Sequence, residues 1–340
     1  MDINFEDIDI ENAIFIDTRS PAEYQKGHIV NAINIPLLDN EQRAIVGTIY
    51  KRAGQESAIK KGLELSGSNF VNIYTKLLKL QRKNVEKKLI IYCARGGMRS
   101  GSVHSFMSSL KIKSYRLVGG YKRYRNIVLN QIENINDNIK FIILTGHTGS
   151  GKTTVLKKMQ ERGLPIIDLE GEAKHMGSAF GAIPYNQIRM TQQQFENRLA
   201  TSLIKLKDPK VIFLEGESKR IGWVNITKNF YEKMVDSDTI IIKRSDSYRI
   251  KKILDDYDIK DTAFKDALGR ISKKLGGEKY KEISIMLENN QDEEVIRELL
   301  INYYDKLYNH SISKHKNIIK TIESEDDDTI IEELVNLYIT

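Results

Sequence analysis

The chain contains one cysteine, Cys93, among its 340 residues, and no apolar run reaches the roughly 18 residues that a membrane-spanning helix needs. A single cysteine excludes a framework of intrachain disulfides. The N-terminal segment MDINFEDIDIENAIF is acidic, whereas a secretory signal has a basic segment followed by an apolar one. We therefore expect a cytoplasmic protein that has no membrane partner.

The composition is that of a folded protein, with 40% hydrophobic and 29% charged residues. A chain of this length can form two packed cores, so we expect two domains. The formal net charge is +7, which permits a polyanionic partner without requiring one. Charge alone therefore gives weak support to nucleic-acid binding.

Strand-like and helix-like segments alternate over the N-terminal part of the chain. The β-rich runs are AIFIDT (13–18), AINIP (32–36), KLIIYC (88–93) and SYRLVGGYKRY (114–124), the last of which ends in a turn. The segment after Ser20 predicts a helix with proline in its first position, and residues 37–88 have a charged helical pattern. Residues 99–110 predict a helix. Its expected buried face consists of Val103, Phe106, Met107 and Leu110.

The single cysteine lies where an apolar run meets the loop ARGGMR and the helix after it. Backbone amides, a helix N-terminus, Arg95 and Arg99 should then surround the thiol and stabilise a thiolate. The loop residues expected to bind an anion beside it are Arg95, Gly96, Gly97 and Arg99. A structural core cysteine would have apolar neighbours on both sides, and here only one flank is apolar. We predict that Cys93 is a reactive nucleophile.

The second half opens with KFIILTGHTGSGKTT (140–154), in which a strand, a glycine-rich turn and a helix follow one another. This is the pattern of a phosphate-binding loop in the context that it requires. The residues predicted to bind phosphate are Gly146, Gly149, Ser150, Gly151, Lys152, Thr153 and Thr154. Backbone N–H groups and the helix N-terminus would hold the anion, Lys152 would reach the outer phosphate, and Thr153 would hold magnesium if it is used. The pattern does not distinguish a nucleotide from another diphosphate.

Two further strands are predicted after the loop, at 210–215 and 238–244. Glu215 ends the first of them, beside the phosphate loop in this architecture, where it would act as a base or orient a metal-bound water unless it is merely solvated. Beyond residue 245 the pattern is mostly helical, and the tail 323–338 predicts an acidic cap followed by a short amphipathic helix. The polar segment 130–140 is either the join between the domains or the end of a helix.

Three segments together resemble a rhodanese domain, in which a loop cysteine carries sulfur as a persulfide. They are FIDTRSPAEYQKGHIVNAINIP (15–36), IIYCARGGMRS (90–100) and RLVGGYKRY (116–124). Arg99 follows Cys93 by six residues, one more than in common rhodaneses, and rhodanese-fold phosphatases share this larger loop. The spacing alone therefore leaves open a phosphatase or an arsenate reductase.

The whole chain resembles the tRNA 2-selenouridine synthase family. The segments that carry this resemblance are the insert 37–65, the phosphate loop, DLEGEAKHMGSAFG (168–181), FENRL (195–199) and EGESKRIG (215–222). The resemblance implies an α/β protein with a rhodanese-like domain at 1–135, which has a helical insert at about 37–88. A P-loop NTPase-like parallel-sheet domain with a helical C-terminal part would follow at 136–340. Within it Asp168 joins Glu215 as a candidate acid, base or metal-orienting group.

The resemblance also implies a transferase that replaces sulfur by selenium at the wobble 2-thiouridine of tRNA. Geranyl diphosphate would first alkylate the sulfur and release diphosphate, and selenophosphate would then supply selenium. Cys93 would attack selenium or otherwise receive it. The partners would be tRNA and these small phosphates, with no tightly bound cofactor and no protein-bound metal. The need for magnesium and the oligomeric state stay open.

Two other functions remain open from the residues. One is a cysteine phosphatase or sulfurtransferase fused to an ATP-dependent kinase-like domain, and the other is a non-enzymatic anion-sensing module. For tRNA binding, Tyr121, Tyr124 and Trp223 are candidates to stack on an unpaired anticodon base. For a geranyl chain, the apolar candidates are Met176, Phe180 and Ile183.

Overall fold

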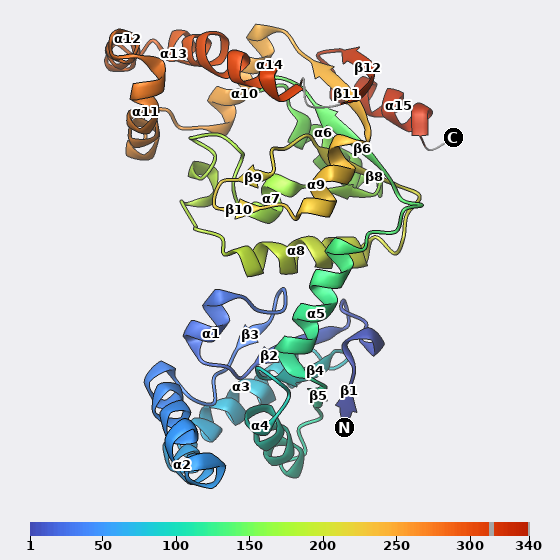
Figure 1. Cartoon of the computed structure of the whole chain (residues 1–340), viewed down its shortest axis with the longest axis vertical. Helices are drawn as coiled ribbons and strands as arrows, with labels where there is room; N and C mark the ends of the chain where they lie inside the picture. The colour runs from blue at the N-terminus through green and yellow to red at the C-terminus, as the bar shows by residue number, and fades with distance from the viewer. Residues whose placement is uncertain (313–315, 339–340) are drawn as a thin grey trace. The chain divides into compact units, whose positions relative to one another are not determined.

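The structure is a computed structural model that describes residues 1–312 and 316–338. The chain divides into two compact units, Met1–Asn130 and Gln131–Thr340 (Figure 1). The predicted boundary at residue 135 follows the end of helix α5 (Gly120–Glu133), which carries the chain from the first unit into the second.

The first unit is built on a five-stranded parallel sheet with the strand order β1-β5-β4-β2-β3. Its strands are β1 (Asp2–Ile3), β2 (Ala13–Asp17), β3 (Ile33–Asn34), β4 (Lys88–Tyr92) and β5 (Tyr115–Leu117). The central strand β4 is covered on both faces, since Leu89 to Tyr92 are at most 1% exposed. After β2 the chain continues to β3 at one edge of the sheet, whereas after β4 it continues to β5 on the other side. The carboxyl ends of β2 and β4 therefore form a topological switch point.

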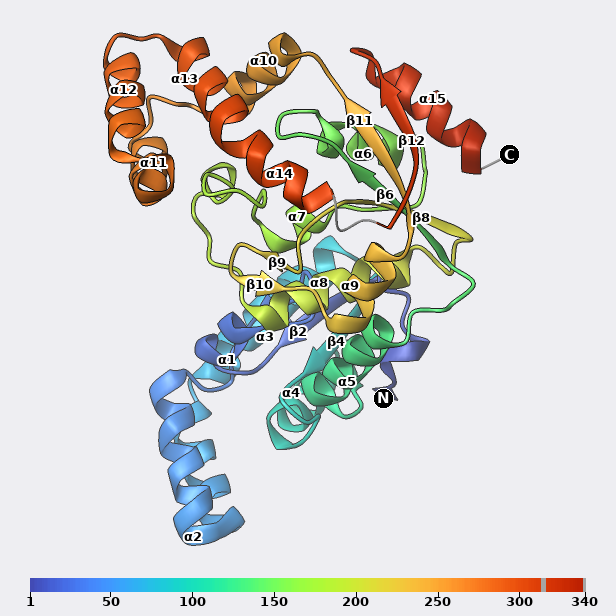
Figure 2. The same cartoon turned by 45° about the horizontal axis from the view of Figure 1, so that its top comes forward.

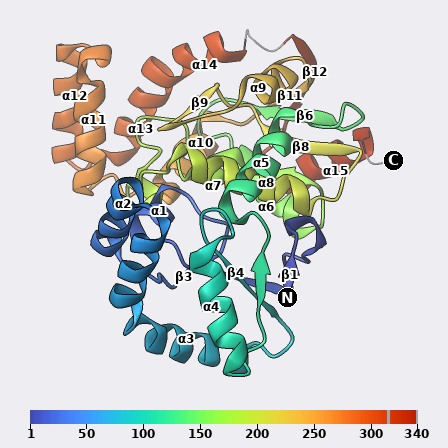
Figure 3. The same ribbon diagram turned by 60° about the horizontal axis from the view of Figure 1, so that its bottom comes forward.

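Two helices of this unit position the loop after β4. Helix α1 (Pro21–Lys26) begins with the predicted proline, and Ser20 and Glu23 form a capping box at its start. Helix α4 (Met98–Ser109) lies beside β4 and β5 (Figure 3). The predicted buried face of α4 is only half right, because Val103 and Met107 are fully buried whereas Phe106 and Leu110 are 45% and 42% exposed. Phe106 packs edge-on against Phe70, and Leu110 caps the end of the helix.

The insert 37–88 forms two helices, as its pattern predicts. Helix α3 (Asn69–Lys83) buries Ile73 and Leu77 in the core of the unit. Helix α2 (Asn40–Ser66) is broken at Gly54, whose φ of 82° is left-handed, and buries little besides Ala58. Helix α2 accordingly projects beyond the sheet of its own unit (Figure 2).

The second unit contains another five-stranded parallel sheet, with the order β12-β11-β6-β8-β7. Its strands are β6 (Lys140–Thr145), β7 (Ile166–Ile167), β8 (Val211–Glu215), β11 (Asp238–Lys243) and β12 (Asn317–Glu323). A short antiparallel pair, β9 (Arg220–Ile221) and β10 (Val224–Asn225), lies outside this sheet. The helices up to β11 are α6 (Lys152–Glu161), α7 (Leu169–Ala173), α8 (Gln192–Lys205) and α9 (Lys228–Val235). Two parallel sheets with helices confirm the predicted α/β fold class.

The C-terminal part of this unit is helical and has a core of its own. It comprises α10 (Asp246–Asp256), α11 (Thr262–Leu275), α12 (Gly277–Glu288), α13 (Asp292–Leu299), a π-helical turn η3 (Leu300–Tyr304) and α14 (Asp305–Ile312). The last helix, α15 (Asp327–Tyr338), packs instead in the core of the sheet. The prediction of a mostly helical region beyond residue 245 is confirmed, although residues 317–323 form the edge strand β12, which was not predicted. The segment NIIKTIE has three isoleucines but no continuous apolar run, and only Ile322 is buried.

A buried ion pair ties the last helix to the sheet. Arg244 follows β11 with its side chain fully buried, and it pairs with Asp327 at the start of α15. Lys158 of α6 contacts the other oxygen of Asp327 at 3.0 Å. The pair therefore connects three elements of the second unit.

Replacing Arg244 with methionine should lower the free energy of unfolding by about 3 kcal/mol, because a buried carboxylate loses its main partner. The matched control is Lys243→Met, whose exposed pair with Glu323 should be worth less than about 1 kcal/mol. Urea denaturation followed by the fluorescence of Trp223, the only tryptophan, measures both. Equal losses in the two variants would contradict this account of the buried pair.

Candidate functional site

The thiol of Cys93 lies at the carboxyl end of β4 and is 3% exposed. The Oγ of Ser100, in the first turn of α4, donates a hydrogen bond to Sγ at 3.2 Å. The carbonyl of Cys93 accepts from the N–H of Tyr121, and that of Ala94 accepts from Lys122. The start of the loop is thus fixed to the start of α5.

Glycine is required at two positions where the loop after β4 packs closely against the turn that leads into α5. Gly120 has a φ of 56°, and a Cβ there would lie 2.3 Å from the carbonyl oxygen of Cys93. Gly96 has a φ of 66°, and its Cβ would lie 2.8 Å from the carbonyl oxygen of Leu117. Gly97 is the N-cap of α4 and makes no side-chain cap, so the first N–H groups of that helix have no side-chain acceptor from this position.

The two loop arginines differ in their surroundings. Arg95 is exposed, whereas Arg99 donates to both carboxylate oxygens of Glu23 in α1, at 2.6 and 3.1 Å. Burial alone would raise the pKa of Glu23, yet the hydrogen bonds and charge of Arg99 lower it to about 2. Two of the five N–H donors of the guanidinium are used in this way, and the remaining donors can hold an anion. Sequence reasoning missed this role of Glu23.

A second ion pair lies beside the first strand of the switch point. Arg19 donates to Asp17 at 2.6 Å and lies 3.8 Å from the ring centroid of Tyr121. Tyr121 and Tyr124 are 8% and 1% exposed, which excludes the predicted stacking on an RNA base. Trp223 of the second unit is 36% exposed and remains a candidate for that role.

In the second unit, the phosphate loop links β6 to α6. The φ angles of Gly146, Gly149 and Gly151 are 154°, 82° and 75°, values that favour glycine. Lys152 folds over the loop and donates to the carbonyl of Gly146 at 2.7 Å. Burial lowers the pKa of Lys152, although nearby carboxylates oppose this effect. The other predicted residues, Ser150, Thr153 and Thr154, lie in the loop or in the first turn of α6.

Carboxyl groups gather next to this loop. Glu215 is 1% exposed and accepts from the backbone N–H of Glu170 at 2.7 Å, and the hydroxyl of Thr153 lies 3.2 Å from Glu170. Burial and neighbouring carboxylates raise the pKa values of Glu170 and Glu215 well above the ordinary range. Asp168 caps α7 by accepting from Gly171, so it serves the helix. Sequence reasoning missed Glu170, which lies in the quoted segment 168–181.

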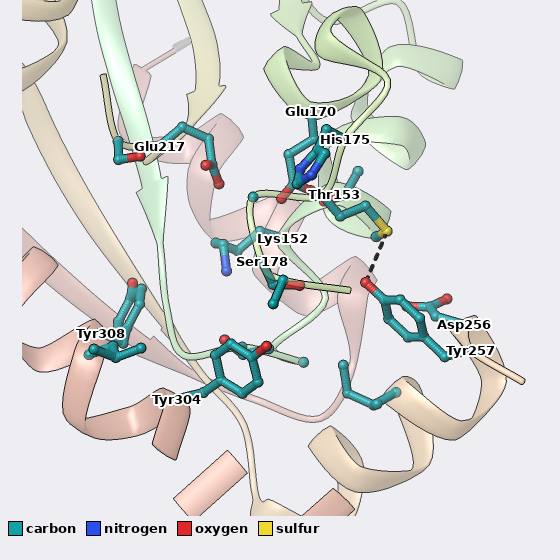
Figure 4. Close-up of a pocket in the computed structure, with 18 of the residues that line it drawn as sticks. Lys152, Thr153, Glu170, His175, Ser178, Glu217, Asp256, Tyr257, Tyr304 and Tyr308 are labelled. Atoms are coloured by element: carbon teal, nitrogen blue, oxygen red, sulfur yellow. Dashed lines mark hydrogen bonds between the residues drawn. The ribbon is translucent and has the colours of Figure 1, made fainter. Parts of the chain in front are cut away.

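The loop faces a cavity of about 790 Å³ (Figure 4). Lys152, Thr153, Glu170 and Glu217 are among the polar residues that line it, and Ser178, Lys252, Asp256 and Lys274 line it too. Apolar and aromatic side chains of the helical part also line it, namely Ile253, Tyr257, Ile271, Tyr304 and Leu307, together with Met176. A smaller pocket of about 30 Å³ shares Tyr257 and Tyr304, and its other lining includes Phe180, Phe264, Leu299 and Leu300. Two of the predicted apolar candidates, Met176 and Phe180, thus line these spaces, and Ile183 packs against the helical core.

Tyr308 of α14 joins the helical part to the phosphate loop. Its hydroxyl hydrogen-bonds to the N–H of Gly146 and to the hydroxyl of Thr145, and its ring centroid lies 5.8 Å from the Lys152 ammonium (Figure 4). Burial raises the pKa of Tyr308 to about 12. Its position 163 residues beyond Thr145 leaves no local signal by which the sequence would reveal this contact.

Residues 1–312 and 316–338 contain neither a metal-binding cluster of His, Cys, Asp or Glu side chains nor a membrane-spanning helix. No three His, Cys, Asp or Glu side chains in these ranges gather as they would around a metal ion. No helix in the same ranges is both long and apolar enough to span a bilayer.

Comparison with known proteins shows similarity along nearly the whole chain. The family model of the tRNA 2-selenouridine synthase AAA domain matches residues 139–264 and 260–337, and that of the rhodanese-like domain matches 5–127. A tRNA 2-selenouridine synthase of Nitrosomonas europaea is 31% identical, with 93% of this chain and 94% of the relative covered. One from Sulfurovum sp. (strain NBC37-1) is also 31% identical, with 93% of each covered.

Among solved structures, the N-terminal domain of a Clostridium difficile 630 protein is 44% identical. The match covers 38% of this chain and 99% of that one, with a TM-score of 0.36. The two family models and the full-length relatives together place this sequence: the chain belongs to the tRNA 2-selenouridine synthase family.

Proposed function

We propose that this protein replaces sulfur by selenium at the wobble 2-thiouridine of tRNA, through an S-geranyl intermediate made from geranyl diphosphate. Family membership supports the overall reaction. The cavity of the second unit supports the S-geranyl intermediate, because residues of the phosphate loop and apolar and aromatic side chains line the same cavity. An anionic head and a hydrocarbon tail are the two parts of a prenyl diphosphate.

Part of the lining suits a prenyl chain. Ile253, Ile271 and Leu307 offer hydrocarbon surface, which would stabilise a prenyl chain by about 0.8 kcal/mol for each buried methylene group. A nucleotide would need polar partners for its base and ribose, and side chains such as Ser178 and Asp256 offer these, so dependence on ATP is the test that separates the two ligands. We infer that the prenyl chain lies along these residues while its diphosphate lies on the loop.

Alkylation forms a bond between the uridine sulfur and the first carbon of the prenyl chain, and the diphosphate leaves with the electron pair. Lys152 and the loop N–H groups stabilise the negative charge that grows on the leaving oxygen. The oxygen donors near Thr153 do not form a resident metal site among the described residues. We therefore propose that any magnesium enters with the diphosphate substrate.

The S-alkylated base must also lose the proton on N3. Glu217 lines the cavity, whereas the predicted base Glu215 is 1% exposed and already accepts a backbone hydrogen bond. Burial raises the pKa of Glu217 to about 7 against the opposing charge of Lys152, with Glu170 and Asp168 also nearby. Tyr308 is the further titratable group that interacts with it. We propose Glu217 as the proton acceptor.

The first unit would carry out the selenium step. Cys93 acts as the nucleophile toward selenophosphate, and the loop N–H groups, Arg95 and Arg99 hold the phosphate group. The selenium released then displaces the geranylthio group from the base. The uridine must reach both chemistries, so tRNA is the common substrate of the two units.

Replacing Lys152 with alanine should slow S-geranylation by about 100-fold to 1,000-fold, because a preorganised donor to the leaving group is lost. Lys205→Ala removes the same charge from the exposed end of α8, outside the cavity lining, and should cost less than about tenfold. Mass spectrometry of nucleosides from a tRNA substrate, with no nucleotide added, measures both. A strict requirement for ATP would favour the kinase-like alternative.

The rate of S-geranylation should rise with pH through about 7, because Glu217 accepts a proton only when it is ionised. Glu217→Gln should abolish this rise of the rate with pH and lower the rate at neutral pH by about 100-fold. Asp256→Asn removes a carboxylate that lines the same cavity but pairs with Lys252. The rate of this variant should still rise with pH. An unchanged profile in Glu217→Gln would exclude this residue as the base.

Replacing Cys93 with serine should abolish selenation and leave S-geranylation intact. No other thiol is present to substitute, because Cys93 is the only cysteine. Chromatography of digested tRNA, with geranyl diphosphate and selenophosphate supplied in turn, separates the two products. Formation of 2-selenouridine by the variant would show that the thiol has no essential chemical role.

A further inference from the structure

The loop around Cys93 is arranged for a tetrahedral oxyanion. Arg99, six residues after the thiol, is fixed by two hydrogen bonds to Glu23. Helix α4 has 12 residues, with no acidic residue in its first turn and no side-chain cap. Its N-terminal N–H groups therefore complement negative charge without competition from a local carboxylate. These groups would bind three oxygens around a central atom.

Electron balance decides which atom of selenophosphate the thiolate attacks. The selenium atom of selenophosphate is in the selenide state and is electron-rich. It is therefore a poor target for a nucleophile. Attack on selenium would force phosphorus to leave with the bonding pair, as phosphite, which reduces it. Attack on phosphorus leaves the pair on selenium and changes no oxidation state. Attack on selenium would also leave a perselenide, from which an outside reductant would have to release selenide, whereas the second course needs none.

We propose that Cys93 attacks the phosphorus of selenophosphate, forming S-phosphocysteine and releasing hydrogen selenide. The inference rests on the proposed function, because selenophosphate is the substrate assigned to this site there. The S–P bond forms as the P–Se bond breaks, and the proton of monoprotonated selenophosphate leaves with selenium. The net charge of reactants and products is equal.

The neighbours of the thiol suit this step. Ser100 donates to Sγ at 3.2 Å, which stabilises the attacking thiolate and later the same thiolate as a leaving group. Arg99 retains N–H donors for the phosphoryl oxygens while Glu23 fixes its plane. Hydrogen selenide leaves as an anion, so the departure of selenium requires no general acid. Asp17 is committed to Arg19 and provides none.

Two further steps complete the reaction. Water attacks the phosphoryl group, which breaks the S–P bond, restores the thiolate and releases phosphate and a proton. Hydrogen selenide attacks C2 of the S-geranylated uridine and expels geranylthiolate, and its proton stays on N3. The base is then 2-selenouridine, and the thiolate takes a proton from water. Selenium thus never bonds to the protein.

The test treats the full chain with selenophosphate in the absence of RNA. Phosphorus NMR of the product should show phosphate, and high-resolution mass spectrometry after denaturation at neutral pH should find a phosphoryl group on Cys93. Selenium has a distinctive isotope pattern, so the two adducts differ in the spectrum. Phosphite as product, or selenium on Cys93, would overturn the proposal. So would equal release of selenide by Cys93→Ser.

A matched pair of serine variants tests the role of the thiol donor. Ser100→Ala should slow hydrolysis of S-phosphocysteine by about tenfold, so the phosphoryl adduct should accumulate. Ser102→Ala removes a hydroxyl of the same helix that hydrogen-bonds only to carbonyls of its own preceding turn, and it should behave as wild type. Similar adduct levels in the two variants would contradict the assigned role of Ser100.

The inference and the proposed function fail in different ways. Formation of S-phosphocysteine by a protein that leaves 2-thiouridine in tRNA unchanged would refute the proposed function and leave the inference standing. Selenation of tRNA by a protein that carries selenium on Cys93 would refute the inference and leave the function standing.

Discussion

Both proposed sites depend on one interaction, the binding of an anion by the backbone N–H groups of a strand-to-helix loop. Each unit places such a loop after an interior strand of a parallel sheet, β4 in one and β6 in the other. The helix that follows adds the positive end of its dipole. In each loop these donors belong to the main chain. The side chains added to each loop then decide what the anion undergoes.

Those added side chains differ in kind. In the loop after β4, the thiol of Cys93 provides a nucleophile. Arg99, which Glu23 fixes, provides a planar set of N–H donors. Beside β6, Lys152 and the apolar lining provide a leaving-group partner and a place for hydrocarbon. A nucleophile within an oxyanion cradle performs group transfer, whereas a cation beside a leaving group favours alkylation of a separate substrate. In the proposed scheme, one fold principle thus serves two reactions.

Local features of the sequence revealed both loops, and contacts between distant residues could not be read from it. The capping box at Ser20 and the phosphate loop are written within a few consecutive residues, so periodicity and glycine placement were sufficient. Glu23 and Arg99 are 76 residues apart, and no pattern along the chain indicates their pairing. Strand β12 escaped prediction for a related reason, since an edge strand with one buried residue lacks the apolar run of a central strand.

The two sites balance charge in opposite ways. Around the thiol, Arg19 and Arg99 are each paired with a carboxylate, so selectivity for an oxyanion must come from the direction of N–H donors more than from net positive charge. Around the phosphate loop, Glu170 and Glu217 line a cavity with Lys152, and burial raises the pKa of both acids. In the proposed reaction, a diphosphate brings further negative charge into that cavity and raises the pKa of Glu217 further. The pH-dependent rise should then lie at higher pH in kcat, which reports the complex, than in kcat/KM, which reports the free enzyme.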